Sequence, residues 1–233
     1  MDEDGVRVRP HVARAVAQAR HVLLDFDGVC FAMPEMGRPW ELLNGLKLRT
    51  SRLAVPTYTV PHVLAYLSAH EPELAPAVEA ARSAVEWEAV LTARMATGLA
   101  ELLTGSTATG RRMWVVGEYS EDAMRAGLRA HGVEQPATVV AGRQGLEYDT
   151  LGTVSVATRA VRLLGVDPSE CLLVSGQTDV LRHAEDSGMA LLGVVSGHDT
   201  RKWLADAAPV VSNLTRLRQA LHDGPPESHR AVL

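Results

Sequence analysis

The chain has 233 residues, 46% of them hydrophobic, and a net charge of −5. This length suffices for one large domain or for a domain with an insertion, and the negative charge argues against a nucleic-acid partner. No apolar run reaches the roughly 18 residues of a membrane-spanning helix, and the N-terminal residues do not resemble a signal peptide. We therefore expect a cytoplasmic protein without a membrane partner, and leave its oligomeric state open.

Short apolar runs that alternate with helical patterns predict a parallel sheet. Strands covered by helices on both faces need such continuous runs. The predicted strands are residues 21–26, 113–116, 137–141, 171–174 and 190–195. Helices are predicted between them at residues 120–131, 153–164 and 178–187, each followed or ended by a glycine. This order predicts an α/β fold with a doubly wound parallel sheet and right-handed crossovers.

One stretch, residues 31–110, interrupts this alternation. It contains no convincing strand, and residues 60–70 and 73–103 carry apolar side chains at helical spacing. The insertion leaves the chain just after the first strand, so it should lie over the ligand crevice of an open α/β sheet. We therefore predict a core of residues 1–30 and 111–233 with a helical cap of residues 31–110. The alternative is a helical subdomain without a lid role.

The most specific segment is Asp25-Phe26-Asp27-Gly28-Val29, at the end of the first predicted strand. Burying two carboxylates there costs free energy unless a cation or a substrate compensates. Mg²⁺ binds one or two carboxylates together with phosphate oxygens. A pair of acids can also divide the roles of nucleophile and proton donor. The segment therefore favours chemistry at Asp25 and Asp27 over two acids that merely cap a loop.

This segment resembles the first motif of the haloacid dehalogenase superfamily, in the Asp-x-Asp-Gly-Val form of its phosphatases and phosphomutases. The resemblance covers almost the whole chain and includes the position of the helical cap. It implies that Asp25 is a nucleophile that becomes an aspartyl-phosphate, that Asp27 is the general acid/base, and that both contribute to a Mg²⁺ site. An Asp at the second position implies phosphate-ester chemistry on a small phosphorylated molecule.

The family's second and third motifs are altered in this chain. The family places a Ser or Thr at the end of the second strand to bind phosphoryl oxygens, where this sequence has Gly117 and Glu118. Ser120 lies three residues on, as a possible phosphate contact or a helix cap. The family's lysine is missing around Leu151. Arg143 is the nearest cation after the third strand, either as a substitute that binds phosphate or as a solvated loop residue.

The fourth motif is also altered, because Ser175 stands where the family has its first metal-binding acid. Asp179 matches the second acid, so the implied metal ligands are Asp25, Asp27, Asp179 and Ser175, and Mg²⁺ should bind weakly. We expect Asp25, Gly117 and Ser175 at one edge of the sheet.

Two hypotheses of function remain open. The first is a phosphatase with a weakened or remodelled site that acts on a small phosphorylated metabolite. The second is a non-catalytic protein that binds an anionic ligand or a protein partner. Basic residues in the cap would suit an anionic molecule in either case, and they are Arg38, Lys47, Arg49 and Arg52.

Overall fold

The structure is a computed structural model, and it describes residues 9–34, 60–105, 109–135, 138–144, 156–197 and 199–224. The four basic residues predicted to line the cap and the stretch around Leu151 lie outside the described residues. No helix in these ranges is both long enough and apolar enough to cross a membrane.

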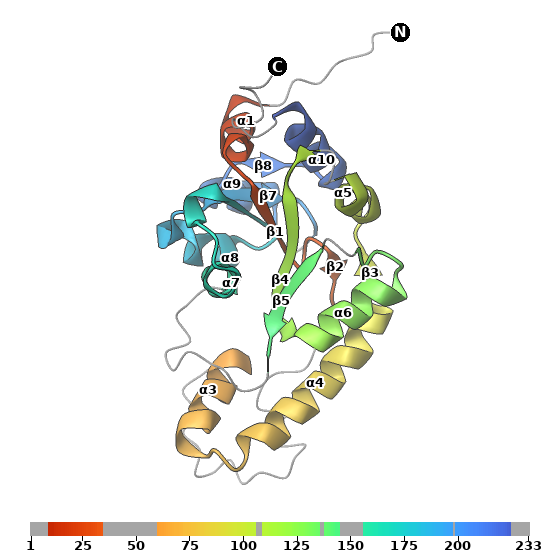
Figure 1. The fold of residues 1–233 in the computed structure, drawn as a ribbon, viewed down its shortest axis with the longest axis vertical. Coiled ribbons are helices and arrows are strands. Elements are labelled where there is room, and N and C mark those ends of the chain that lie inside the picture. Colours follow the sequence, from red (N-terminus) through yellow and green to blue (C-terminus); the bar gives the residue numbers. More distant parts are fainter. Residues whose placement is uncertain are drawn as a thin grey trace.

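Six parallel strands form the main sheet in the order β5-β4-β1-β6-β7-β8 (Figure 1). The strands are β1 (His21–Asp25), β4 (Arg112–Ser120), β5 (Val139–Arg143), β6 (Cys171–Ser175), β7 (Ala190–Val194) and β8 (Val210–Val211). All five predicted strands are confirmed with shifted ends, whereas the two-residue β8 is too short to be predicted from an apolar run. Strand order reverses at β1, and such a switch point is where open α/β sheets bind ligands.

Helices cover both faces of this sheet. One layer holds α1 (Pro10–Ala17), α5 (Leu99–Gly105), α6 (Glu121–Ala130) and α10 (Leu214–Asp223), and the other holds α7 (Val156–Leu164), α8 (Thr178–His183) and α9 (Arg201–Ala207). Successive strand side chains point to opposite faces, so Val22 and Leu24 pack into the first core and Leu23 into the second. The doubly wound α/β prediction is therefore confirmed.

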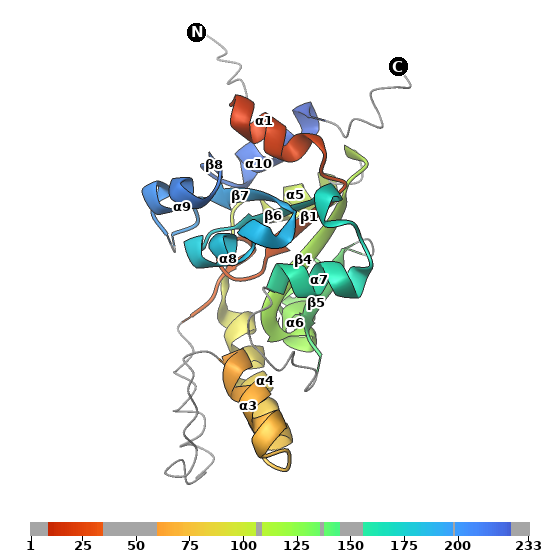
Figure 2. The same cartoon turned by 90° about the vertical axis from the view of Figure 1, so that its left-hand side faces the viewer.

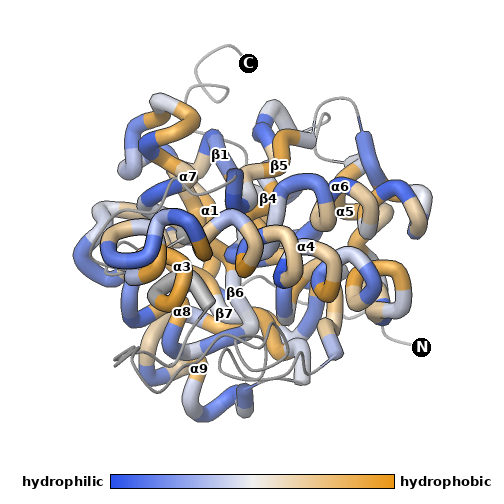
Figure 3. The backbone as a smooth tube through the Cα atoms, turned by 90° about the horizontal axis from the view of Figure 1, so that it is seen from below, coloured by the Kyte–Doolittle hydropathy of each residue, from blue (hydrophilic) through white to orange (hydrophobic). Residues whose placement is uncertain are grey.

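A helical hairpin, α3 (Val60–His70) and α4 (Ala75–Thr92), extends from the carboxyl edge of the sheet (Figures 1 and 2). Seen from that end, the two helices lie in front of the sheet, and hydrophilic and hydrophobic segments alternate along them (Figure 3). The base of α4 packs against α6 and β4, and Val90 is part of the core. The hairpin is thus joined to the core along one side.

The predicted cap range differs from the structure at its C-terminal end. The continuous helix expected at 73–103 is interrupted by β3 (Arg94–Met95), which pairs antiparallel with β2 (Phe31–Ala32). Helix α5 follows and packs against α10, with Leu99, Leu102 and Leu103 buried in the core. Residues 99–105 therefore belong to the core layer, because their apolar side chains are buried in that core.

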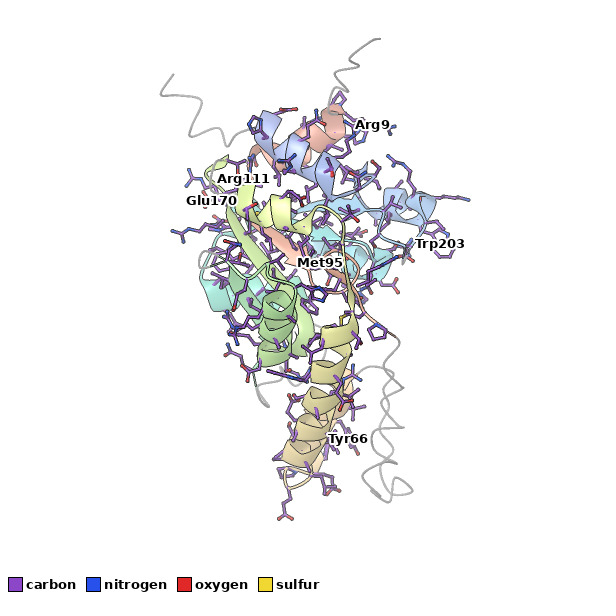
Figure 4. All side chains as sticks on the ribbon, turned by 90° about the vertical axis from the view of Figure 1, so that its right-hand side faces the viewer. Arg9, Tyr66, Met95, Arg111, Glu170 and Trp203 are labelled. Atoms are coloured by element: carbon purple, nitrogen blue, oxygen red, sulfur yellow. The ribbon has the colours of Figure 1, made fainter. Side chains whose placement is uncertain are left out.

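The opposite, amino edge of the sheet is closed by a buried arginine, Arg111 (Figure 4). Its guanidinium donates hydrogen bonds to the backbone carbonyls of Val16, Ala19, Leu221 and Gly224. These carbonyls lie at and just beyond the C-terminal ends of α1 and α10, where helices leave their last carbonyls without partners. Arg111 thus joins the first and last described helices.

Candidate functional site

Asp25 is the last residue of β1, and its neighbours on both sides come from the strands that the sequence predicted. It lies opposite Val116 of β4, while Leu24 lies opposite Val174 of β6. The Ser175 hydroxyl, at the end of β6, donates a hydrogen bond of 2.6 Å to Asp25 Oδ2. The carboxyl ends of three strands therefore meet, and the prediction that Asp25, Gly117 and Ser175 share one edge is confirmed.

Burial makes Asp25 an unusual carboxylic acid. Only 7% of the residue is exposed, and desolvation raises its pKa to about 8, with added repulsion from Asp27 and Glu118. Hydrogen bonds from the Ser175 hydroxyl and the Asp27 backbone act in the opposite direction but are weaker. Asp25 is therefore mostly protonated at neutral pH unless a nearby positive charge stabilises its ionised form.

Asp27 lies in a tight turn directly after β1. Gly28 has a φ of 87°, a conformation that side-chain-bearing residues rarely adopt, and its N–H donates to the Phe31 carbonyl at 2.7 Å. This turn points the Asp27 side chain at two donors, namely the Tyr119 hydroxyl (3.2 Å to Oδ2) and the Met33 N–H (3.4 Å to Oδ1). Asp27 is thus held in one orientation.

Tyr119 and Gln177 are site residues that the sequence analysis missed. The Tyr119 hydroxyl holds the Asp27 carboxylate, and burial together with that carboxylate raises the pKa of Tyr119. The Gln177 side chain donates to the Asp27 backbone carbonyl at 3.1 Å. Both positions adjoin altered family motifs, Tyr119 two residues after Gly117 and Gln177 two after Ser175. Their closeness in sequence to the altered motif positions is the signal that could have identified them.

Gly117 lies at a tightly packed position, where an added side chain would require its neighbours to move by a few tenths of an ångström. A Cβ at this position would lie 3.0 Å from Phe26 Cβ and 3.3 Å from Met124 Cε. Its neighbour Glu118 is exposed, and its charge raises the pKa of Asp25. Ser120 occupies the N-cap position of α6, but its side chain makes no capping hydrogen bond. Gly117 therefore supplies no hydroxyl, and the helix-cap role of Ser120 is not seen. The phosphate contact of Ser120 stays a prediction.

Arg143 does not lie in the position expected of a phosphate-binding cation. It is 2% exposed, and its guanidinium forms ion pairs with Glu79 at 2.9 Å and Glu86 at 2.8 Å, both on α4. It also donates to the Glu118 carbonyl, and Glu86 accepts from the Ser120 N–H at 2.8 Å. Since two carboxylates already balance this cation, Arg143 fastens α4 to the ends of β4 and β5.

Another arginine, Arg159 on α7, lies near the altered second motif. Its guanidinium donates to the Gly117 carbonyl at 3.5 Å. Burial lowers the pKa of Arg159, while the Glu118 carboxylate opposes that shift. Arg159 was not predicted from the sequence because it lies four residues into a helix rather than at the helix start.

The residues at this edge fit Mg²⁺ only as a weakly bound ion. Asp25 and Asp27 offer two carboxylates, which Mg²⁺ accepts when phosphate oxygens and water complete its shell. Asp179, by contrast, lies exposed on the first turn of α8. Within the described ranges, no group of three or more His, Cys, Asp and Glu residues is placed to hold a metal. The predicted four-ligand set is therefore reduced to Asp25 and Asp27, with Ser175 as a hydrogen-bond donor.

The residue after Ser175 also leaves no room for an additional acid. A Cβ on Gly176 would lie 2.1 Å from Ser196 Oγ and 2.6 Å from the Gly28 carbonyl oxygen. The turn after β6 is thus closed around a glycine, and a third carboxylate there would require the neighbouring turns to move.

No family model matches the chain, and no curated protein matches it in sequence. Many solved structures do match in fold. They include a predicted phosphatase from Clostridium acetobutylicum (14% identity, 88% of this chain and 99% of that chain, TM-score 0.62). Another is a haloacid dehalogenase-like family hydrolase from Streptococcus pneumoniae (12% identity, 86% and 97%, TM-score 0.54).

A third is CbbY from Rhodobacter sphaeroides in complex with phosphate (17% identity, 85% and 96%, TM-score 0.54). At these identities the likeness concerns the fold, over nearly the full length of each matched chain. The chain therefore has the α/β fold of haloacid dehalogenase-like phosphatases, with an inserted helical hairpin.

Proposed function

We propose that the protein is a weakened phosphatase that hydrolyses a small phosphorylated metabolite through Asp25. The observation that carries this proposal is the pair of oriented carboxylates at the switch point. Ser175 holds Asp25 at 2.6 Å, and Tyr119 holds Asp27 at 3.2 Å. Two acids with different environments, one desolvated and one hydrogen-bonded by a tyrosine, suit the division into nucleophile and general acid/base.

The proposed reaction has two steps. In the first, a carboxylate oxygen of Asp25 bonds to phosphorus, the bond to the leaving oxygen breaks, and Asp27 gives that oxygen a proton. In the second, Asp27 takes a proton from water, the water oxygen bonds to phosphorus, and phosphate leaves with Asp25 restored. A bound Mg²⁺, held by Asp25 and Asp27, would supply positive charge for the phosphoryl group. Asp25 must be ionised to attack, and its raised pKa disfavours that form unless a cation is bound beside it.

The alternative is a non-catalytic protein that binds a small anionic molecule at the same edge. Two observations weigh against catalysis, and they apply equally to an anionic ligand, which would need a cation beside it. Arg143 is committed to Glu79 and Glu86, and the charges that act on Asp25 are the carboxylates of Asp27 and Glu118. A phosphate dianion would thus meet net negative charge there unless a cation accompanies it.

Phosphate release from a panel of phosphorylated metabolites with Mg²⁺ tests the proposal. We expect slow turnover that Asp25→Asn abolishes and that Asp27→Asn lowers by about 10² to 10⁴. The matched control is Asp179→Asn, which removes an exposed acid and should leave turnover unchanged. Turnover that survives Asp25→Asn would contradict the proposal. If no substrate is turned over but Mg²⁺ with beryllium fluoride raises the melting temperature, the binding alternative is supported.

A further inference from the structure

The carboxyl end of β4 is bulged where it lies beside α4 (Figure 1). The ladder with β5 is regular up to Val116 and resumes at Ser120, where the register has shifted. Between these positions, residues 117–119 of β4 lie opposite Gly142 of β5. Such a bulge interrupts the ladder and re-aims a side chain. Tyr119, at the end of the bulge, is therefore positioned by contacts other than the regular pairing of the two strands.

A buried ion pair supplies those contacts on both sides of Tyr119. The Arg143 guanidinium and the Glu86 carboxylate are both buried and share two hydrogen bonds of 2.8 Å. Arg143 also donates to the Glu118 carbonyl at 2.6 Å, and Glu86 accepts from the Ser120 N–H at 2.8 Å. These two groups belong to the peptide bonds directly before and after Tyr119. One ion pair between α4 and β5 thus fixes both peptide bonds of this tyrosine.

The side chain of Tyr119 links this backbone to Asp27. Its ring packs against Phe26, with ring centroids 5.5 Å apart, and its hydroxyl donates to Asp27 Oδ2 at 3.2 Å. The Met33 N–H donates to the other carboxylate oxygen at a longer distance, 3.4 Å. A continuous chain of contacts therefore runs from α4 through Tyr119 to the carboxylate that is proposed to act as general acid/base.

We propose that Tyr119 is a positioning residue for Asp27, and that helix α4 controls it through Glu86. The inference rests on the phosphatase role proposed for Asp27. A general acid must lie within hydrogen-bond reach of the oxygen that it protonates, and Tyr119 keeps the Asp27 carboxylate in one orientation. When Glu86 is lost, the Ser120 N–H loses its acceptor, and the backbone that aims the tyrosine is released. The helix beside the site thereby regulates the proton-transfer step.

Leaving groups of different acidity test the positioning role. The alkoxide of ethyl phosphate needs a proton from Asp27 in order to leave, whereas 4-nitrophenolate leaves without one. Tyr119→Phe keeps the ring that packs on Phe26 and removes the hydroxyl. We expect it to lower kcat for ethyl phosphate about tenfold and kcat for 4-nitrophenyl phosphate by less than about twofold. Glu86→Gln should show the same selective loss, and equal losses with the two substrates would overturn the proposal.

A second readout needs no turnover. In the full chain labelled with ¹³Cζ-tyrosine, the Tyr119 signal is assigned with Tyr119→Phe, and its position reports the hydrogen bond of the hydroxyl. We expect Asp27→Asn and Glu86→Gln to shift this signal. The matched control is Glu79→Gln. Glu79 pairs with the same guanidinium at 2.9 Å, but through Nε, whereas the Glu118 carbonyl is held through Nη1. Its substitution should leave the Tyr119 signal in place.

The two readouts separate this inference from the phosphatase proposal. If neither substrate is turned over but Asp27→Asn and Glu86→Gln still shift the Tyr119 signal, the phosphatase proposal fails, and the control of Asp27 by α4 is supported. A Tyr119 signal that does not respond to Glu86→Gln, or that responds equally to Glu79→Gln, would overturn that control.

Discussion

The two edges of the sheet differ in how fully a buried charge is compensated by its neighbours. At the amino edge, the Arg111 guanidinium is surrounded by four backbone carbonyls, so its donors are satisfied. At the carboxyl edge, the Asp25 carboxylate has one short side-chain hydrogen bond, from Ser175, and two nearby carboxylates that repel it. A buried charge with full compensation holds a fold together, whereas one without it is stabilised only by a ligand or by protonation.

The largest effect should come from the amino edge. Arg111→Met removes hydrogen bonds to the ends of both α1 and α10 and leaves buried carbonyls without donors, so we expect a loss of about 3 kcal/mol in the free energy of unfolding. Arg112→Met changes the next, exposed residue and should change that free energy by less than about 0.5 kcal/mol. Urea unfolding of both variants measures the difference, and similar losses would contradict the role given to Arg111.

The carboxyl edge also contains a compensated charge, Arg143, whose ion pairs join the helical hairpin to the sheet. Glu86→Gln removes a carboxylate that pairs with Arg143 and accepts from the Ser120 N–H, so we expect a loss of about 2 kcal/mol. The exposed Glu88, two residues on in α4, supplies the control Glu88→Gln. Hydrogen exchange of the amides in α4 should increase in Glu86→Gln alone. Unchanged exchange would mean that apolar packing on α6 suffices to hold α4.

Substitution of Asp25 should raise the stability of the protein instead of lowering it, because the ionised form of Asp25 destabilises the folded state. The pKa of Asp25 is raised from 3.8 to about 8. The contribution of this group to the stability of the folded protein is therefore fully present below pH 4 and is lost as the pH rises towards 8. Asp25→Asn removes that cost. We expect the variant to melt about 5 °C higher than the wild type at pH 8 and by a smaller margin at pH 5.

The matched control is Asp179→Asn, at an exposed acid, which should shift the melting temperature little at either pH. A melting temperature that falls in Asp25→Asn at pH 8 would show that the ionised carboxylate is compensated after all, and the contrast between the two edges would then fail.

Prediction from sequence succeeded where a pattern repeats and failed where a single contact decides. Apolar runs such as Val22–Leu24 predicted the strands, because burial on both faces requires them. The Asp25 and Asp27 pair predicted the edge of the sheet where the candidate site lies. The structural role of Arg143 was not predictable in this way, since its partners Glu79 and Glu86 lie more than 50 residues away and belong to a helix with several acids. The glycine at position 117 was interpreted only as a lost hydroxyl, whereas the structure shows that it also lies tightly packed against Phe26.

The smallest effect should come from the other end of the strand that carries Asp25. The Trp114 indole N–H donates to His21 Nδ1 at 3.1 Å, which requires a neutral imidazole. Desolvation and the nearby Arg112 and Arg20 lower the pKa of His21, while Glu170 opposes them. A lowered pKa means that this contribution to stability is present above pH 6.5 and is lost as the pH falls through the folded-state pKa.

We expect the wild type to lose up to about 1 kcal/mol between pH 7.5 and pH 5 through this contact, and His21→Gln to lose less over the same range. Because Asp25 acts in the opposite direction, the His21 effect is measured in the Asp25→Asn background. An equal loss in both proteins there would show that the bond between Trp114 and His21 does not govern the acid side of the stability profile.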